Sequence, residues 1–280
     1  MWQRYQLILR VLAPTHIGWN KIGNVQRTRP YVTGRALWGA LTARLTRDQY
    51  ATPTAADYQA TGQWVHEHLA LPYLYPAVQH NGSYRLLLPW DDTTPARILS
   101  SYTSTALDPA SYAADEGLLH EVEYIAPHTC DSGEPVYLVG FLFLDTDAIS
   151  QDCLTALRHA LQRLQIGGER GYGWGRLKLV DLSPCAPCTS WDLFCTTYAT
   201  DLSGLRPHLT LEQGSSLLAH TIATGGHAQG ELEPLVGREW AEAGAGQQLA
   251  FSGVCYAPGA TPTQPTTYKI GDYGIWHPPS

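Results

Sequence analysis

The chain has 280 residues and a formal net charge of −7, and 44% of its residues are hydrophobic. This length predicts one elaborated domain or two small ones, and the apolar content excludes a disordered chain outside the Pro/Thr-rich residues 258–267 and the Pro278-Pro279 tail. No apolar run reaches about 18 residues, so we expect no membrane partner, and the N-terminus lacks a signal-peptide layout, which favours a cytoplasmic protein.

The N-terminal part predicts a strand followed by a helix. Apolar side chains alternate over residues 3–12, which is typical of a half-buried strand. A polar, basic loop then runs from Trp19 to Pro30. Thr33 is a suitable N-cap for a helix from Gly34 to about Arg47, because apolar side chains recur there at helical spacing.

The middle of the chain completes a recognisable order of elements. Residues 48–117 are expected to form an irregular insertion, with helical pieces near 55–70 and a short strand near 84–88. Strands are predicted at 118–126 and, from a near-continuous apolar run, at 135–144. A helix from Asp145 or Asp147 to about Gln165, a glycine-rich loop and a strand over about 175–182 follow. The order β-α-β-β-α-β predicts an α+β fold with a ferredoxin-like (RRM-like) unit over residues 1–183.

Residues 184–280 give a weaker signal. Glycine, proline and threonine recur, and strands are predicted near 249–256 and 268–276. We expect a smaller β-rich C-terminal portion, with a degenerate second unit as one interpretation.

The glycine-rich loop carries the clearest functional signal. Five glycines fall within nine residues in Ile166-Gly-Gly-Glu-Arg-Gly-Tyr-Gly-Trp-Gly175. Glycine lets a backbone approach a ligand closely, arginine pairs with phosphate, and aromatic rings stack on bases. The loop is not a dinucleotide fingerprint, because it follows a helix and leads into a strand. The composition of the loop therefore predicts that it binds RNA.

The distribution of charge supports this hypothesis although the net charge is negative. Residues 1–47 contain eight Lys or Arg and no acid, and residues 158–178 contain five Lys or Arg and the single acid Glu169. Residues 48–157 contain 15 acids and only two arginines. A polyanion responds to local potential, so a basic face on an acidic body can bind it if the fold joins the two windows.

The cysteines give no firm metal site. Six irregularly spaced cysteines favour reduced thiols. Cys185-Ala-Pro-Cys188 is a C-x-x-C pair, but zinc needs two further ligands and redox activity needs a thioredoxin-like context. Cys195 and a histidine could complete a zinc site, but the sequence does not mark which histidine. We expect no metal and no other cofactor.

Three segments together resemble the RAMP superfamily, the RNA-binding subunits of CRISPR effector complexes, and type III most. They are Pro14-Thr-His-Ile-Gly18, Pro30-Tyr-Val-Thr-Gly-Arg-Ala-Leu-Trp-Gly-Ala-Leu41 and the glycine-rich loop. Thr33 stands where the family usually has proline, and Arg35 stands where serine is common. The resemblance covers residues 5–47 and 118–182, but not 48–117 or 190–280.

The resemblance implies a guide-RNA-binding subunit of an antiviral ribonucleoprotein complex, with other RAMP subunits and a large effector subunit as partners. The N-terminus of the first helix also suits a phosphate, because its free N–H groups carry a partial positive charge. The candidate RNA-binding residues are His16, Trp19, Lys21, Arg27, Arg29, Thr33, Gly34, Arg35, Gly167, Gly168, Arg170, Tyr172, Trp174 and Arg176.

Within the resemblance, a non-catalytic subunit that caps the 5′ handle of the guide fits best. The family's target-cleaving subunits use an aspartate from the loop after the first strand, and residues 19–30 contain no Asp or Glu. Alternatives are a repeated backbone subunit along the guide and an endoribonuclease that processes the guide precursor with His16 as general base. A scaffold that binds only acidic proteins is a further alternative.

Overall fold

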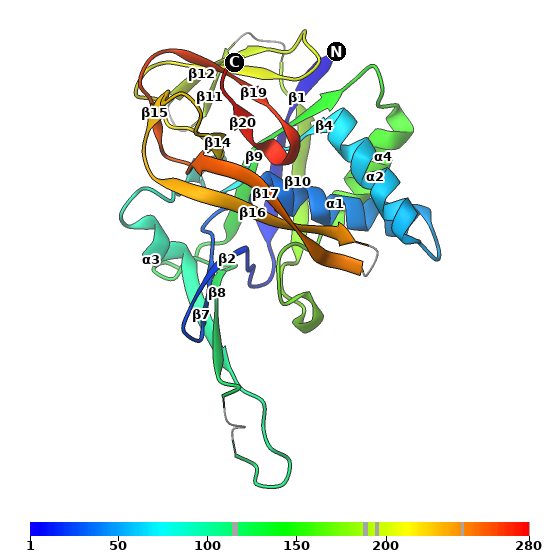
Figure 1. The fold of residues 1–280 in the computed structure, drawn as a ribbon, viewed down its shortest axis with the longest axis vertical. Coiled ribbons are helices and arrows are strands. Elements are labelled where there is room, and N and C mark those ends of the chain that lie inside the picture. Colours follow the sequence, from blue (N-terminus) through cyan, green and yellow to red (C-terminus); the bar gives the residue numbers. More distant parts are fainter. Residues whose placement is uncertain (114–116, 187–189, 194–195, 242–243, 280) are drawn as a thin grey trace.

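The structure is a computed structural model that describes residues 1–113, 117–186, 190–193, 196–241 and 244–279. It has a mixed α+β fold with several sheets (Figure 1). No helix in the described part of the chain is both long enough and apolar enough to cross a membrane.

A six-stranded antiparallel sheet forms the centre of the N-terminal part. Its strands run in the order β10-β1-β9-β5-β6, and β4 pairs with β9 beside this path. The bounds are β1 Trp2–Val11, β4 Leu69–Ala70, β5 Tyr75–His80, β6 Ser83–Leu86, β9 Val136–Asp145 and β10 Leu177–Pro184.

Three helices cover one face of this sheet, namely α1 Gly34–Gln49, α2 Ala55–His68 and α4 Gln151–Gln162. Leu37 and Leu41 of α1 join Leu7 and Leu9 of β1 in one buried cluster. The Thr33 hydroxyl accepts the Ala36 N–H at 3.3 Å and caps α1, as its sequence predicts. The short helix α3 Thr94–Ile98 lies apart from this layer, before β7.

The helix expected from Asp145 or Asp147 begins later, at Gln151. The Ser150 hydroxyl accepts the Cys153 N–H at 3.2 Å and is the cap. Asp145 instead ends β9 and accepts a hydrogen bond from the N-terminal amine of Met1 at 3.2 Å. Both signals are acidic or hydroxyl caps before an apolar run, so the sequence alone did not separate them.

The strand predicted at 118–126 forms, but its expected place in the main sheet is wrong. It is β8 (His120–Ile125), which belongs to a separate four-stranded sheet in the order β2-β3-β8-β7, with β2 Gly18–Ile22, β3 Val25–Thr28 and β7 Leu99–Ser104. The strand beside β9 is β5, from the segment expected to be an insertion. The first four residues of β5 are fully buried, whereas polar side chains at half-buried positions occupy most of β8.

The C-terminal part forms an eight-stranded sheet in the order β11-β12-β13-β19-β20-β14-β17-β16. Its strands are β11 Ser190–Leu193, β12 Thr196–Asp201, β13 His208–Leu211, β14 Thr221–Ile222, β16 Leu232–Ala241, β17 Gly244–Tyr256, β19 Thr266–Ile270 and β20 Trp276–His277. A two-stranded sheet joins β15 Ala228–Gln229 to β18 Thr261–Pro262. The strand expected at 249–256 is part of β17, and the one expected at 268–276 is divided by the 3₁₀ turn η2 Asp272–Gly274.

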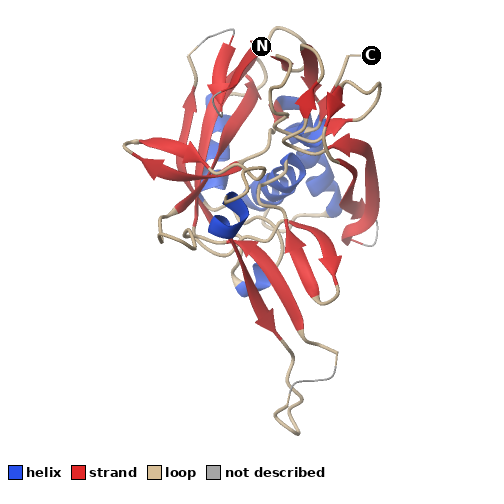
Figure 2. Cartoon of the chain, turned by 90° about the vertical axis from the view of Figure 1, so that its left-hand side faces the viewer, coloured by secondary structure: helices blue, strands red, loops and turns tan. Residues whose placement is uncertain are grey.

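The C-terminal part packs on the main sheet and shares a core with it. Trp2, Tyr75 and Phe143 of the main sheet join Tyr268 and Trp276 of the C-terminal sheet in one buried cluster. Figure 1 shows the long β16–β17 hairpin crossing in front of α1, and Figure 2 shows β7 and β8 extending away from the body. The hairpin places C-terminal residues beside the segments whose sequence predicts RNA binding.

Candidate nucleic-acid interface

The loop after β1 and the glycine-rich loop lie together, as the charge distribution predicted. The Gly168 N–H donates to the His16 carbonyl oxygen at 2.9 Å, and the Gly175 N–H donates to the Pro14 carbonyl oxygen at 2.7 Å. Gly167 has φ +82°, and a Cβ there would lie 2.2 Å from the His16 carbonyl oxygen. Only glycine allows this approach, so the loop joins the two segments through its backbone.

His16 is held inside this junction. Its side chain is buried, and Nδ1 lies 2.7 Å from the carbonyl oxygen of Glu123 on β8. A carbonyl oxygen only accepts, so Nδ1 carries the hydrogen. A Cβ at Gly18 would lie 2.8 Å from Nε2, and one at Gly168 would lie 3.0 Å from Cδ2. The ring therefore fills the space between two glycines.

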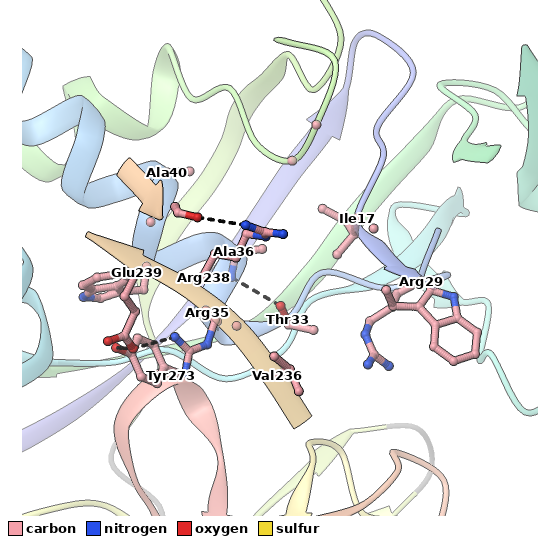
Figure 3. A pocket seen from close by; sticks show the side chains of 18 of the residues that line it. Ile17, Arg29, Thr33, Arg35, Ala36, Ala40, Val236, Arg238, Glu239 and Tyr273 are labelled. Carbon is pink, nitrogen blue, oxygen red and sulfur yellow. Dashed lines mark hydrogen bonds and ion pairs between the residues drawn. The ribbon is translucent and has the colours of Figure 1, made fainter. Parts of the chain in front are cut away.

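A groove of about 1020 Å³ opens beside the junction (Figure 3). Its walls are the loop after β1, the glycine-rich loop, one side of α1, and β16 with part of β17. The predicted RNA-binding residues that line it are His16, Trp19, Arg29, Thr33, Arg35, Gly167, Gly168 and Arg170. The predicted residues outside its lining are Lys21, Arg27, Gly34, Tyr172, Trp174 and Arg176.

Arg29 is engaged by the C-terminal part. Its two terminal nitrogens donate to the two Glu233 oxygens at 2.9 and 3.2 Å, and its guanidinium lies 5.3 Å from the Trp19 ring centre. Both side chains of the ion pair are nearly buried, with 12% and 13% exposed. Glu233 also accepts from His220, whose Nδ1 lies 2.6 Å from the Tyr73 hydroxyl. This network joins the loop before α1 to β16.

The electrostatics of this network fit a neutral histidine beside a charged carboxylate. Burial acts to raise the pKa of Glu233, but the hydrogen bonds from His220 and Arg29 outweigh it and lower the pKa to about 2. Burial lowers the pKa of His220 despite the hydrogen bond to Glu233. At neutral pH, His220 therefore donates through Nε2 to Glu233 and accepts the Tyr73 hydroxyl at Nδ1.

Arg35 is engaged in a second contact with the same hairpin. It donates to Glu239 at 2.8 Å and to the Ser252 hydroxyl at 3.0 Å, and its guanidinium lies 3.5 Å from the Tyr273 ring centre. A Cβ on Gly237 would lie 2.4 Å from Nε of Arg35, so a glycine in β16 allows this packing.

Backbone carbonyl oxygens of two other segments pack against the first residue of α1. A Cβ on Gly34 would lie 2.2 Å from the Tyr273 carbonyl oxygen and 2.3 Å from that of Leu71. The Ala36 N–H is taken by Thr33. Arg29 and Arg35, which lie near this end of α1, pair with glutamates of the C-terminal part.

The remaining predicted residues lie around the junction. Arg27 on β3 donates to Glu123 at 3.0 Å, and Lys21 on β2 is exposed. Trp174 packs edge-to-face on Tyr124, with ring centres 5.0 Å apart, whereas Tyr172 is 83% exposed. The backbone of Arg176 accepts the Leu12 N–H at 2.9 Å, and its side chain is exposed.

Sequence reasoning missed the contribution of the β16–β17 hairpin to the groove. Arg238 lines the groove, and Glu233 and Glu239 pair with its arginines. Arg47, at the end of α1, also lines it. Arg47 belongs to the basic window of residues 1–47 and could have been found there, whereas Arg238 stands in an acidic segment, among Glu231, Glu233, Glu239 and Glu242.

No group of three or more His, Cys, Asp or Glu side chains converges on a metal-sized site within the residues that the structure describes. Cys185 is half-buried, and Cys188 and Cys195 lie outside the described residues.

No protein-family model and no curated protein matches this chain. Among solved structures, the chain is similar to a chain of the Type III-B Cmr-beta bound to cognate target RNA and AMPPnP, at 12% identity and a TM-score of 0.50, over 91% of this chain and 84% of that one. It is also similar to a chain of Type III-B Cmr-beta bound to cognate target RNA, at 12% identity and a TM-score of 0.48, over 91% and 85%. At 12% identity, the similarity to the first of these chains shows a shared fold.

Proposed function

We propose that this protein is a non-catalytic, guide-RNA-binding subunit of a type III-like CRISPR ribonucleoprotein complex, and that it caps the 5′ handle of the guide. The observation that carries the proposal is the junction of the loop after β1 with the glycine-rich loop, beside a groove lined by five arginines. The fold shared with a Type III-B Cmr-beta chain, over most of both chains, supports it. Other RAMP subunits and a large effector subunit would be its partners.

The order of elements supports a ferredoxin-like unit within this fold. The series β1-α1-β5-β9-α4-β10 has the β-α-β-β-α-β order, and these strands lie side by side as β10-β1-β9-β5 with antiparallel neighbours. In this assignment β5 takes the position that the sequence suggested for residues 118–126. The loop after β1 and the loop before β10 then lie at one end of two adjacent strands.

A binding role is favoured over catalysis by the chemistry of the loop after β1. Residues 19–30 carry amides and cations but no carboxylate that could act as a general base. Among the groups at the junction, His16 has one ring nitrogen bound to a backbone carbonyl and little space around the other. These restraints disfavour His16 as a general base, so guide processing by His16 ranks second.

The test is binding of the purified protein to a guide RNA with its repeat-derived 5′ end, compared with the same RNA lacking that end. We expect tighter binding of the first RNA, with crosslinks in residues 14–35 and 166–176. Arg85→Ala, which removes an exposed arginine outside the groove lining, serves as the control and should bind normally. Crosslinks confined to 48–113 or 196–229 would contradict the proposal, and equal affinity for both RNAs would favour a backbone position.

Cleavage is tested on the same preparation. We expect no cutting of repeat RNA by the isolated protein. Metal-independent cutting that disappears in His16→Gln, with folding retained, would make the protein a guide-processing endoribonuclease instead.

A further inference from the structure

The five arginines that line the groove fall into two groups. Arg29 and Arg35 are ion-paired with Glu233 and Glu239, and only 12% and 17% of their side chains is exposed. Arg47, Arg170 and Arg238 are exposed, and none of the three pairs with a carboxylate among the residues that the structure describes. The groove therefore contains two arginines that are already ion-paired and three that are available to bind a ligand.

The paired arginines are poor phosphate ligands in this arrangement. A phosphate that bound Arg29 would leave the nearly buried Glu233 carboxylate without its cation, beside a neutral His220. A phosphate that took Arg35 would break its contacts with Glu239 and Ser252 and compete with the Tyr273 ring for the guanidinium. An unpaired carboxylate in a partly desolvated site is costly, and it also repels the phosphate itself.

The available arginines come from three separate elements around the groove. Arg170 lies in the 3₁₀ turn of the glycine-rich loop, η1 Arg170–Tyr172. Arg47 lies in the last turn of α1, where Nε donates to the Tyr58 hydroxyl at 3.2 Å and the two terminal nitrogens remain for a ligand. Arg238 extends from β16 and donates through one terminal nitrogen to the Gly246 carbonyl oxygen at 3.1 Å.

The surface between these arginines suits a nucleotide chain. Ala36, Ala40 and Ala43 of α1 line the groove and are short, so a backbone can lie close to the helix. On the hairpin side the groove is lined by Val236 and Leu249, which are 53% and 65% exposed. Apolar side chains can cover base faces while arginines hold phosphates.

We propose that Arg47, Arg170 and Arg238 contact the RNA phosphates in the groove, so that the RNA backbone follows the exposed side of α1 beneath the β16–β17 hairpin, and that Arg29 and Arg35 instead hold the hairpin in place. The inference rests on the proposed RNA-binding function and changes which residues perform it. Arg47 and Arg238 become binding residues, and the hairpin becomes one wall of the RNA site.

The experiment measures how the RNA affinity of the 280-residue chain depends on salt concentration. Neutralising one phosphate of a single strand contributes a slope of about −0.7 to a plot of log affinity against log salt concentration. Arg47→Ala, Arg170→Ala and Arg238→Ala should each make the slope shallower by about 0.7, and the triple variant by about 2. The three lysine substitutions should restore most of each slope, because lysine keeps the charge.

Two controls make the result decisive. Arg85→Ala should leave the slope unchanged, and the thermal unfolding temperatures of the three alanine variants should match that of the wild type, because these side chains are exposed. Arg35→Ala should instead lower the unfolding temperature.

Each remaining outcome points elsewhere. Unchanged slopes in the triple variant, with shallower slopes in Arg27→Ala or Lys21→Ala, would overturn the inference and leave RNA binding intact. Wild-type protein that binds no RNA but binds an acidic protein would overturn the proposed function and the inference with it.

Discussion

At the scale of single residues, the two aromatic rings of the glycine-rich loop have different roles. Trp174 contacts the rings of Tyr124 and Tyr102, with ring centres 5.0 and 6.3 Å away, so it fastens the loop to the β2-β3-β8-β7 sheet. Tyr172 is 83% exposed. The sequence offered both rings as candidates for stacking on a base, and burial separates them.

We therefore predict that Tyr172→Ala weakens RNA binding by roughly 1–3 kcal/mol, the range for loss of one base–aromatic stack, without changing the unfolding temperature. Trp174→Ala should lower the unfolding temperature, because it removes a packed ring. Fluorescence anisotropy with labelled RNA and thermal unfolding of the same samples measure both effects. Unchanged RNA affinity in Tyr172→Ala would show that this ring does not stack on a base.

A second residue-scale prediction concerns Glu233. Its pKa is lowered to about 2 in the folded protein, against about 4.3 in an unfolded chain. A group with a depressed folded pKa contributes stability above its unfolded pKa, and that stability is lost as the pH falls towards the folded value. The stabilisation by Glu233 should therefore be complete above about pH 5 and decline steadily below about pH 4.3.

Glu233→Gln tests this directly. Breaking a buried ion pair costs on the order of 3–5 kcal/mol, so the variant should be less stable in urea at pH 7. The difference between the two proteins should shrink between pH 5 and pH 3. A difference that stays constant over this range would mean that the Glu233 carboxylate is not coupled to folding. Glu231→Gln, a change at an exposed neighbour, is the matched control.

At the scale of elements, the backbone of the glycine-rich loop determines whether the two basic segments meet. Gly167 has φ +82° and lies against the His16 carbonyl, whereas a Cβ on Gly171 would meet no described atom within 4 Å. The two glycines therefore provide a matched comparison within one loop. Gly167 is required by its close approach to the His16 carbonyl, whereas a Cβ at Gly171 would meet no described atom nearby.

Gly167→Ala should destabilise the protein by at least about 1–2 kcal/mol, the cost of the left-handed conformation for a residue with a Cβ, and should weaken RNA binding. Gly171→Ala should leave both the urea midpoint and the RNA affinity unchanged. If the two variants behave alike, the contact between the loops does not depend on the conformation of Gly167.

The β16–β17 hairpin is the element whose role changes most between sequence and structure. Arg29 pairs with Glu233 and Arg35 pairs with Glu239, and 204 residues separate the partners in each pair. The two arginines are six residues apart in the sequence, and so are the two glutamates. One stretch of β16 therefore runs alongside the segment that leads into α1. The hairpin is thereby fixed over the groove at two points.

At the scale of the whole molecule, the N-terminal and C-terminal parts share one core. Trp2, Tyr73, Tyr75 and Phe143 pack in the same buried cluster as Tyr198, Leu209, Tyr268 and Trp276. Burying one large apolar side chain contributes roughly 1.5–3 kcal/mol, so the four N-terminal residues together contribute about as much as the total stability of a typical domain, about 5–15 kcal/mol.

We accordingly predict that a chain ending at residue 186 does not fold on its own, and that the full chain unfolds in one cooperative step. Denaturant unfolding followed by tryptophan fluorescence and by far-UV circular dichroism should give coincident curves. A fragment of residues 1–186 with a sharp thermal transition of its own would show instead that the main sheet is independent of the C-terminal part.

Elements with local signals could be predicted from the residues alone. The apolar alternation of residues 3–12, the Thr33 cap and the apolar run at 135–144 predicted β1, α1 and β9 closely. The glycine-rich loop and the charge windows predicted which segments meet, because close backbone approach and a shared charge bias are both legible in the residues themselves.

The strand beside β9 and the arginines available to a ligand depend on contacts that form when the whole chain folds. Residues 118–126 carry a valid strand pattern, but a strand pattern does not identify its neighbour, and β5 takes the buried place. Arg29 and Arg238 look alike as residues, yet one is paired with Glu233 and the other is exposed. That difference arises from partners about two hundred residues away, because the energy of a charge depends on what the fold places beside it.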